Sequence, residues 1–270
     1  MNIGLVLSGG GVRGVAHIGA IKALEEDGIV PTHISGSSAG AVVGALYASD
    51  YSWKDILTFF KGIQLFDIKK YARKKPGFID AEKFYFDFKQ YLKKDTFEAL
   101  GKKLTVTTTD ILNGELTIFN QGELIKPVIA SAAFPGIFTP VQIGDSYFID
   151  GGALDNFPVA PIKNDCDMLI GVYANWFKKV AIHELKHSYN VVERVFKIRS
   201  VIDDVSKFSE CDLVIAPVDL GDYGTFDKKK LDEIFELGYN ATKEALVKTD
   251  FLKIKGPSEK SFDRTLETSS

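Results

Sequence analysis

The sequence predicts an α/β protein built on a mainly parallel sheet. A short apolar run, Ile3–Leu7, reads as a strand buried inside such a sheet. Apolar residues then recur at helical spacing from Gly14, and Gly28 closes this helix. A second short strand, Thr32–Ser35, precedes a helix of small residues, Ala41–Ala48. The order strand, helix, strand, helix predicts parallel strands joined by right-handed crossovers.

The rest of the chain continues in the same style. Leu104–Asp110 is rich in β-branched residues and predicts a strand, and Asn113-Gly114 predicts a hairpin turn into a partner strand, Glu115–Phe119. Further strands are expected at Tyr147–Ile149, Met168–Tyr173 and Leu213–Ala216, and helices at 125–133, 183–209, 227–248 and over most of 51–100. We expect one domain over residues 1–255 and a polar, disordered tail over 256–270.

Composition excludes several classes of protein. Of 270 residues, 45% are hydrophobic and 26% are charged, which excludes intrinsic disorder for most of the chain. The net charge of −3 argues against a nucleic-acid partner. Cys166 and Cys211 are too few for a disulfide scaffold and read as buried thiols of a reducing compartment. The small-residue run Ala39–Ala48 is too short to cross a bilayer. We therefore expect a soluble, cytoplasmic protein that can touch a membrane only peripherally, and its oligomeric state stays open.

A serine stands at a glycine turn between the second strand and the following helix. Residues 36–40 read Gly36-Ser37-Ser38-Ala39-Gly40, which matches the G-x-S-x-G nucleophile elbow in the required strand-to-helix context. The helix N-terminus would place backbone N–H groups near Ser38. The alternative is a connecting turn in which Ser37 or Ser38 only caps the helix.

A second glycine turn follows the first strand. The residues Gly9, Gly10, Gly11, Val12, Arg13 and Gly14 can point several backbone amides at one anion, as an oxyanion hole requires. The same six residues satisfy the dinucleotide pattern G-x-G-x-x-G. That pattern also needs an acidic residue at the end of the second strand, and this strand ends in Ser and Gly instead.

The group that would activate Ser38 is best sought among carboxylates. His17 and His33 lie in the first helix and second strand, where core positions are expected, and His183 and His187 would complete a triad only in the chain order of another fold. Asp150 follows a short strand and precedes Gly151 and Gly152, which leave room for close approach. An aspartate serves as a base at neutral pH only when burial raises its pKa, so this pairing requires a partly desolvated pocket. The alternative for residues 150–152 is a plain tight turn.

Together these motifs resemble the patatin-like phospholipases. The glycine block at 9–14, the Ser38 elbow, the small-residue and proline segment Ser131–Pro140 and the Asp150-Gly151-Gly152 turn occur in the order of that family. The resemblance implies a three-layer α/β/α sandwich, a Ser38–Asp150 dyad without histidine, and hydrolysis of acyl esters of lipids or similar molecules. It implies no metal and no organic cofactor.

Two other signals compete with this interpretation. His183-Glu184-Leu185-Lys186-His187 matches the H-E-x-x-H zinc motif, but no third ligand follows, so we interpret it as part of a solvated helix. Basic residues between 69 and 75 could form a membrane-facing lip, although a solvated loop is the simpler interpretation. Aromatic residues of the same region could wall an acyl pocket; they are Phe59, Phe60, Phe66, Phe78, Phe84, Phe86, Phe88 and Tyr91.

The function that we expect is a serine acyl hydrolase that forms an acyl-enzyme on Ser38. Gly10, Gly11 and Val12, helped by Arg13, would hold the oxyanion, and Asp150 would accept the serine proton. Two alternatives remain open. An acyltransferase would pass the chain to an acceptor other than water, and a catalytically silent member of the same fold would bind lipid without turnover.

Overall fold

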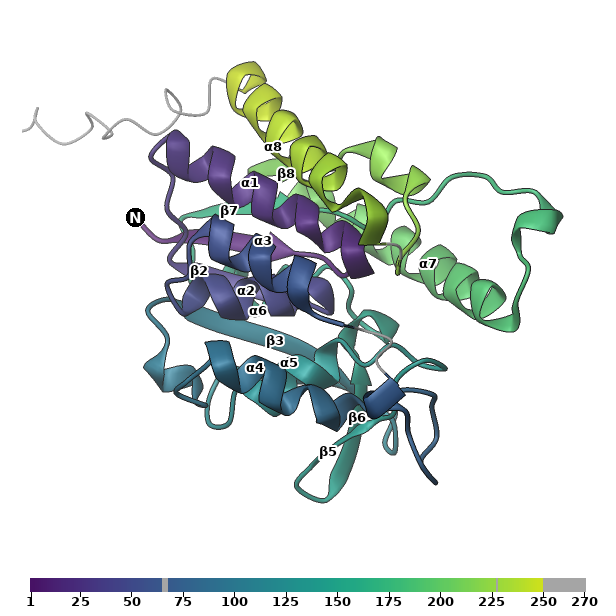
Figure 1. Ribbon diagram of the computed structural model, residues 1–270. Helices are drawn as coiled ribbons and strands as arrows, with labels where there is room; N and C mark the ends of the chain where they lie inside the picture. The colour runs from purple at the N-terminus through teal and green to yellow at the C-terminus, as the bar shows by residue number, and fades with distance from the viewer. Residues whose placement is uncertain (65–67, 227, 250–270) are drawn as a thin grey trace, which may run out of the picture.

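An eight-stranded sheet forms the centre of the computed structural model, which describes residues 1–64, 68–226 and 228–249 (Figure 1). The strand order is β5-β6-β3-β2-β1-β7-β8, and β4 pairs with β3 outside this path. The strands are β1 (Ile3–Leu7), β2 (His33–Ser37), β3 (Lys103–Asp110), β4 (Glu115–Phe119), β5 (Val141–Ile143), β6 (Ser146–Asp150), β7 (Met168–Val172) and β8 (Leu213–Ile215).

The sheet is parallel at its centre and antiparallel at one edge. Strands β8, β7, β1, β2 and β3 pair in parallel, whereas β4 and β6 run antiparallel to β3, and β5 runs antiparallel to β6. The expected hairpin between β3 and β4 is confirmed. The parallel order places the carboxyl ends of β1 and β2 side by side, because Leu7 is in register with Gly36. The two glycine turns of the sequence therefore meet at one edge of the sheet.

Helices cover both faces of the sheet, and each face has its own core. In β1, Leu5 and Leu7 point into the larger core, while Val6 points into a smaller core with Phe157 and Tyr173. The alternation follows from the two-residue period of a strand. The helices are α1 (Val15–Glu26), α2 (Ala39–Ala48), α3 (Trp53–Gly62), α4 (Tyr85–Tyr91), α5 (Ile125–Ser131), α6 (Ala160–Lys163), α7 (Ser188–Ser206) and α8 (Leu231–Lys248).

The three layers follow from the residues that fill these cores. Helices α1, α2, α3, α5 and α8 contribute to the larger core, and α6 and α7 contribute Ile162 and Val201 to the smaller one. The predicted α/β/α sandwich is thus confirmed. Within the described ranges, none of the helices has the length and apolarity needed to cross a membrane.

Some predicted boundaries were wrong. Helix α7 begins at Ser188 instead of 183, because His187 is extended and donates its backbone N–H to the Asn190 side chain, which caps the helix. Strand β5 was not predicted, since three residues carry too little pattern. Cys166 and Cys211 are half-buried free thiols, less enclosed than expected. The predicted tail at 256–270, Phe66 and the predicted helix start at 227 lie outside the described residues.

Candidate active site

Ser38 lies at the junction of β2 and α2 in a backbone conformation that few side chains adopt. Its φ is 53° and its ψ is −124°. The turn is tight enough to require both flanking glycines: a Cβ on Gly36 would lie 2.6 Å from the carbonyl carbon of Gly40, and a Cβ on Gly40 would lie 2.2 Å from the carbonyl oxygen of Leu7. The strained turn presents the Ser38 hydroxyl at the edge of the sheet, half-buried.

Asp150 meets Ser38 at this edge. The Ser38 hydroxyl donates a hydrogen bond of 2.7 Å to Oδ2 of Asp150, at the end of β6. The other carboxylate oxygen accepts the backbone N–H of Gly152 at 2.8 Å. Gly151 is required because a Cβ there would lie 2.3 Å from the carbonyl oxygen of Thr107. The structure therefore brings together the two residues that the sequence selected from positions 112 residues apart.

Burial changes the chemistry of this carboxyl group. Asp150 is 2% exposed, and this desolvation raises its pKa to about 7, although the hydrogen bonds from Ser38 and Gly152 work in the opposite direction. A carboxylate with a pKa near neutrality accepts a proton more readily than an exposed aspartate does. The desolvated pocket that the sequence argument required is present.

The glycine loop (Gly9–Gly14) lines the same pocket as this pair through Gly10, Gly11, Val12 and Arg13. Its Gly9 and Val12 amides are engaged: Gly9 donates to the carbonyl of Asn156 at 3.1 Å, and Val12 donates to the carbonyl of Thr225 at 2.8 Å. Within the described residues, no acceptor is found for the backbone N–H groups of Gly10 and Gly11. These two amides are the donors that the loop leaves for a ligand.

Arg13 acts on the loop itself. Its side chain is fully buried, and its guanidinium donates to the carbonyls of Gly10 and Trp176 and, at 2.9 Å, to the side chain of Asn175. Burial lowers the pKa of Arg13 to about 10. Each nitrogen of the guanidinium is thus bonded to the protein, so the arginine, which also lines the pocket, fixes the shape of the loop.

An apolar pocket of about 130 Å³ opens above Ser38 and Asp150. Phe134 stacks on Phe196 of α7 with ring centres 4.9 Å apart. The expected aromatic wall is present in part, since four of the eight aromatic residues considered line the pocket and Phe78 and Phe86 are exposed instead. The aromatic lining residues are Phe59, Phe60, Phe84, Phe88, Phe134, Phe138, Phe196 and Phe226.

The four histidines lie away from this pocket. Burial lowers the pKa of His17 to about 4, and its ring contacts the carbonyl of Ser8 at 2.8 Å. His33 lies at the far end of β2 from Ser38. His183 lies in a 3-10 turn, and His187 precedes α7, so the H-E-x-x-H residues do not share a helix face. Within the described residues, no three His, Cys, Asp or Glu side chains are grouped as a metal would require.

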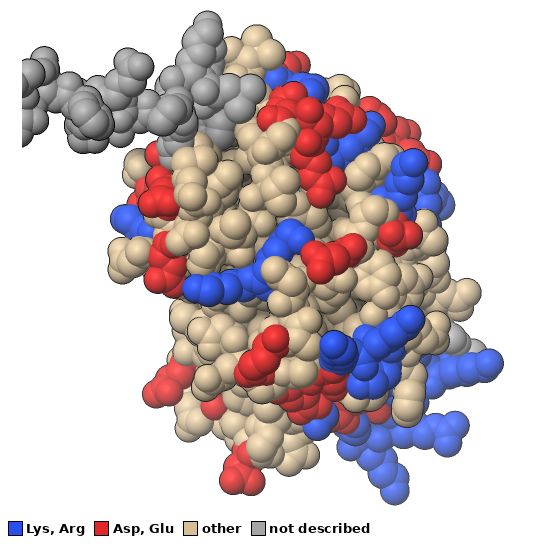
Figure 2. Space-filling view, turned by 90° about the vertical axis from the view of Figure 1, so that its left-hand side faces the viewer, with Lys and Arg blue, Asp and Glu red and all other residues tan. Residues whose placement is uncertain are grey.

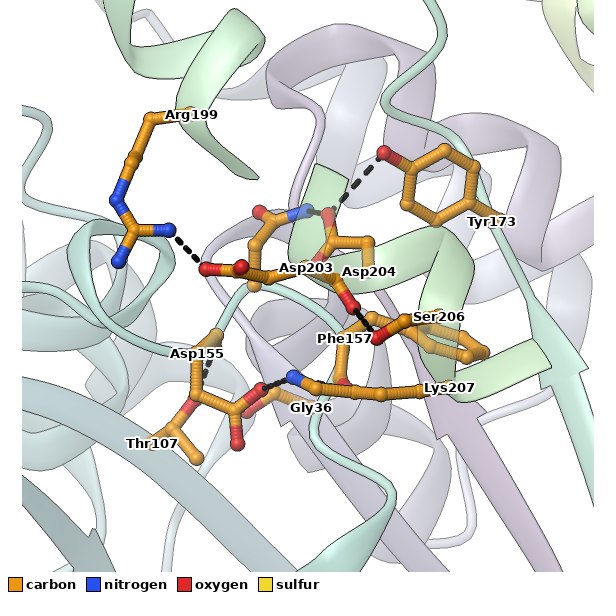
Figure 3. A network of polar contacts seen from close by, with 11 residues as sticks. Gly36, Thr107, Asp155, Phe157, Tyr173, Arg199, Asp203, Asp204, Ser206 and Lys207 are labelled. Atoms are coloured by element: carbon orange, nitrogen blue, oxygen red, sulfur yellow. Dashed lines mark hydrogen bonds and ion pairs between the residues drawn. The ribbon is translucent and has the colours of Figure 1, made fainter. Parts of the chain in front are cut away.

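Asn156 is a residue that the sequence analysis missed. It lines the pocket, its carbonyl accepts the Gly9 N–H, and its side-chain oxygen lies 2.3 Å from where a Gly9 Cβ would be. Its amide donates to Asp204 of α7 at 2.7 Å, and the same carboxylate oxygen accepts the hydroxyl of Tyr173 at 3.1 Å (Figure 3). Asn156 thus connects the glycine loop to α7.

Further supports hold the turns from other segments. The Ser131 hydroxyl accepts the backbone N–H of Ser38 at 2.9 Å. The Thr107 hydroxyl lies between the carbonyls of Gly36 and Asp155, and Lys207 forms an ion pair of 2.6 Å with Asp155, as Figure 3 shows. These contacts tie the Ser38 turn, strand β3 and the end of α7 into one polar framework.

The basic residues near 69–75 are partly committed to internal contacts. Lys70 forms an ion pair with Asp87, and Lys75 forms ion pairs with Asp80 and Glu82. These pairs stabilise the segment between α3 and α4. They hold two of the five basic residues of this segment in internal contacts.

An α/β sandwich that holds a serine–carboxylate pair beneath an apolar pocket is the arrangement of a class of proteins that includes many that process esters. The family model of the patatin-like phospholipases matches residues 5–162, more than half of this chain. The chain therefore belongs to the patatin-like phospholipase family.

Individual relatives agree with this assignment. An uncharacterized NTE family protein of Mycobacterium tuberculosis is 36% identical over 179 residues, which cover 64% of this chain and 49% of the relative. A lysophospholipase NTE1 of Meyerozyma guilliermondii is 27% identical over 276 residues, covering 88% of this chain and 19% of the relative. The chain thus spans about half the length of the mycobacterial relative and a fifth of the fungal one.

Solved structures share the fold at low identity. VipD of Legionella pneumophila matches with a TM-score of 0.60 at 19% identity, covering 92% of this chain and 67% of VipD. The effector ExoU matches with a TM-score of 0.51 at 17% identity, covering 92% of this chain and 53% of ExoU. These likenesses concern the fold alone.

Proposed function

We propose that the chain is a serine acyl hydrolase that cleaves ester bonds of lipids or lipid-like molecules. The observation that carries the proposal is the 2.7 Å hydrogen bond from Ser38 to the buried Asp150, made beneath an apolar pocket. Membership of a phospholipase family and likeness to chains named lysophospholipases support a lipid ester as substrate.

The proposed reaction proceeds in two steps. The Ser38 oxygen attacks the ester carbonyl carbon while Asp150 takes its proton, and the Gly10 and Gly11 amides stabilise the oxyanion. The alcohol leaves with that proton, which leaves an acyl-enzyme. Water then attacks the acyl carbon and gives a proton to Asp150. When the fatty acid leaves, the proton returns to Ser38.

This mechanism assigns roles more narrowly than the motif did. The Val12 amide is engaged by Thr225, and the Arg13 guanidinium by the loop and its neighbours, so both act as supports for the two donating amides. Gly9, Gly14, Gly36, Gly40 and Gly151 serve the geometry of the turns.

A fluorophosphonate probe followed by mapping of the adduct tests this proposal. We expect one adduct on Ser38. Ser38→Ala should abolish labelling and lower ester turnover on the order of 10⁴-fold or more. Asp150→Asn should lower both by roughly 10²–10⁴-fold, the usual contribution of a positioned base.

His183→Ala provides the matched control, because His183 is exposed and lies outside the pocket. It should leave turnover near the wild-type value. Full loss of activity in this variant would contradict the dyad and favour a histidine-dependent mechanism. Lipid binding without any turnover, unchanged by Ser38→Ala, would favour a silent lipid-binding protein.

A further inference from the structure

An apolar ridge runs along the outer side of α7. Its members are 38–71% exposed and recur at intervals of four and three residues along the helix; we call them the α7 ridge, and they are Val191, Val195, Ile198, Ile202 and Val205. The other side of α7 faces the protein, where Phe196 stacks on Phe134 and Asp204 is buried. The ridge is therefore an exposed apolar face opposite the side by which α7 packs against the protein.

The ridge lies at the end of the molecule where the parallel strands have their carboxyl ends, and this is where the pocket opens. Phe196 and Lys197 of α7 line the pocket, opposite Phe60 and Ile63 at the end of α3. The segment between β7 and α7 projects from the body at this end (Figure 1). Ile182, in that segment, is 83% exposed. The helix that carries the ridge therefore also forms part of the pocket wall.

The charge around the ridge has the opposite sign to that of the whole chain. Residues 177–207 contain seven Lys or Arg and four Asp or Glu, a formal charge of +3, whereas the whole chain carries −3. Four of these cations form ion pairs, Lys178 with Asp222, Lys197 with Glu193, Arg199 with Asp203 and Lys207 with Asp155, so the two exposed lysines of the segment before α7 are the ones used in the proposal below. Lys179 and Lys186 are exposed near Ile182. Figure 2 shows the end of the molecule that carries the amino ends of the parallel strands, where acidic and basic side chains are mixed over most of the face and basic ones gather at the lower right.

We propose that the α7 ridge, with the basic segment before it, docks the protein on an anionic lipid bilayer. Exposed aliphatic side chains enter the boundary between head groups and acyl chains, and neighbouring lysines contact anionic head groups. This inference rests on the proposed function, because docking at this surface would bring the acyl pocket to a lipid substrate.

A second copy of the chain is the competing occupant. The alternating spacing of four and three residues is that of paired helices, but the ridge covers only two heptads, whereas a coiled coil is indicated by three or four. The local excess of positive charge would also repel an identical surface, while it attracts anionic lipid.

Co-sedimentation with vesicles tests the docking without using activity. The full chain is mixed with vesicles of phosphatidylcholine alone or with phosphatidylglycerol added, at low and high salt. The ridge variant is V195S/I202S, and the matched control is V30S/V247S, at two exposed valines away from the ridge. We expect stronger binding to the anionic vesicles, weakened by salt. The ridge variant should bind them at least about tenfold more weakly, and the control should bind like wild type.

Three results would overturn the proposal: no vesicle binding by the wild-type chain, equal binding by the ridge variant, or equal weakening in the control. A wild-type dimer that the ridge variant converts to monomer, seen by analytical ultracentrifugation, would assign the ridge to a second copy. Hydrolysis of a short, monomeric ester should not change in the ridge variant. Vesicle binding without any hydrolysis would reject the proposed function and leave the docking surface in place.

Discussion

The Ser38–Asp150 pair makes the protonation of one carboxyl group decisive. Asp150 is the only titratable partner of the Ser38 hydroxyl among the described contacts, and burial raises its pKa to about 7. As a general base it must be ionised in the free enzyme. Burial of Asp150 therefore determines the pH range in which this pair can react.

We expect kcat/KM for a soluble ester to rise with pH through about 7 and to level off above it. Below this pH Asp150 is protonated and cannot accept the serine proton. The measurement is a pH profile between pH 4 and pH 9 with a substrate that does not itself titrate. A rise centred near pH 4, the value of an ordinary aspartate, would show that burial does not tune this group.

The same shift predicts a stability gain when the charge is removed. The pKa of Asp150 is raised by folding, so the folded state binds its proton more tightly than the unfolded state, and stability falls as pH rises from about 4 to about 7. At pH 8, Asp150→Asn should therefore unfold at a higher denaturant concentration than wild type. Its free energy of unfolding should be larger by up to about 4 kcal/mol. The gain should vanish at pH 4. A variant that is less stable than wild type at pH 8 would contradict this account.

The site residues that could be predicted from the sequence share one property: each belongs to a turn in which all the residues of a recognisable motif are adjacent in the sequence. Gly36–Gly40 and Asp150–Gly152 each show a strand end, glycines and a functional side chain within a few positions. Asn156 and Thr225 each hold the glycine loop through one backbone hydrogen bond from a distant segment. A lone side chain or carbonyl in tertiary contact leaves no pattern in the sequence, so these supports were not predictable.

At the scale of elements, α7 is joined to the glycine loop through Asn156. Both hydrogen bonds of Asp204, from Asn156 and Tyr173, end on one carboxylate oxygen, and the other oxygen is buried without a partner. An asparagine can keep both bonds through its single oxygen, whereas an alanine leaves two buried donors unsatisfied.

We therefore expect Asp204→Ala to slow the reaction of Ser38 with a fluorophosphonate roughly tenfold and to lower the melting temperature. Asp204→Asn should retain most of the labelling rate. Comparing kcat with KM on a short ester separates positioning from substrate binding, since the loss should fall on kcat. Equal losses in the two variants would show that the charge of Asp204, and not its hydrogen bonds, is what matters.

Element boundaries were predictable where a specific local signal marks the end of the element. Strand β1 matched because a run of buried residues ends at glycines, and the β3–β4 hairpin matched because its turn chemistry is specific. The predicted start of α7 was wrong because the amphipathic pattern continues through 183–187, whereas the Asn190 side chain caps the helix so that it begins only after His187. A cap set by one side-chain contact outweighed the pattern.

The whole molecule has two cores on opposite faces of one sheet. The larger core lies under α1, α2, α3 and α8, and the smaller one contains Phe157 and Tyr173. Strands β1 and β7 supply side chains to both, in alternation. Because neither face can lose its packing without exposing these shared strands, we expect the two cores to unfold together.

The two tryptophans allow a direct measurement of this coupling. Trp53 packs against the larger core, and Trp176 against the smaller one. Fluorescence of the Trp53→Phe and Trp176→Phe variants then reports each face separately during urea unfolding. For each variant, unfolding is also followed by circular dichroism. The fluorescence and dichroism transitions of the same variant should coincide.

A substitution in one core should shift the unfolding transition that is observed in both cores. Phe157 is fully buried in the smaller core, so Phe157→Ala should lower the free energy of unfolding by roughly 3–5 kcal/mol. In a cooperative molecule the Trp53 signal, on the opposite face of the sheet, shifts by the same amount as the Trp176 signal. If only the Trp176 transition moves, the smaller core and α7 unfold on their own. The glycine loop, which is tied to α7 through Asn156, would then lose this support before the rest of the fold unfolds.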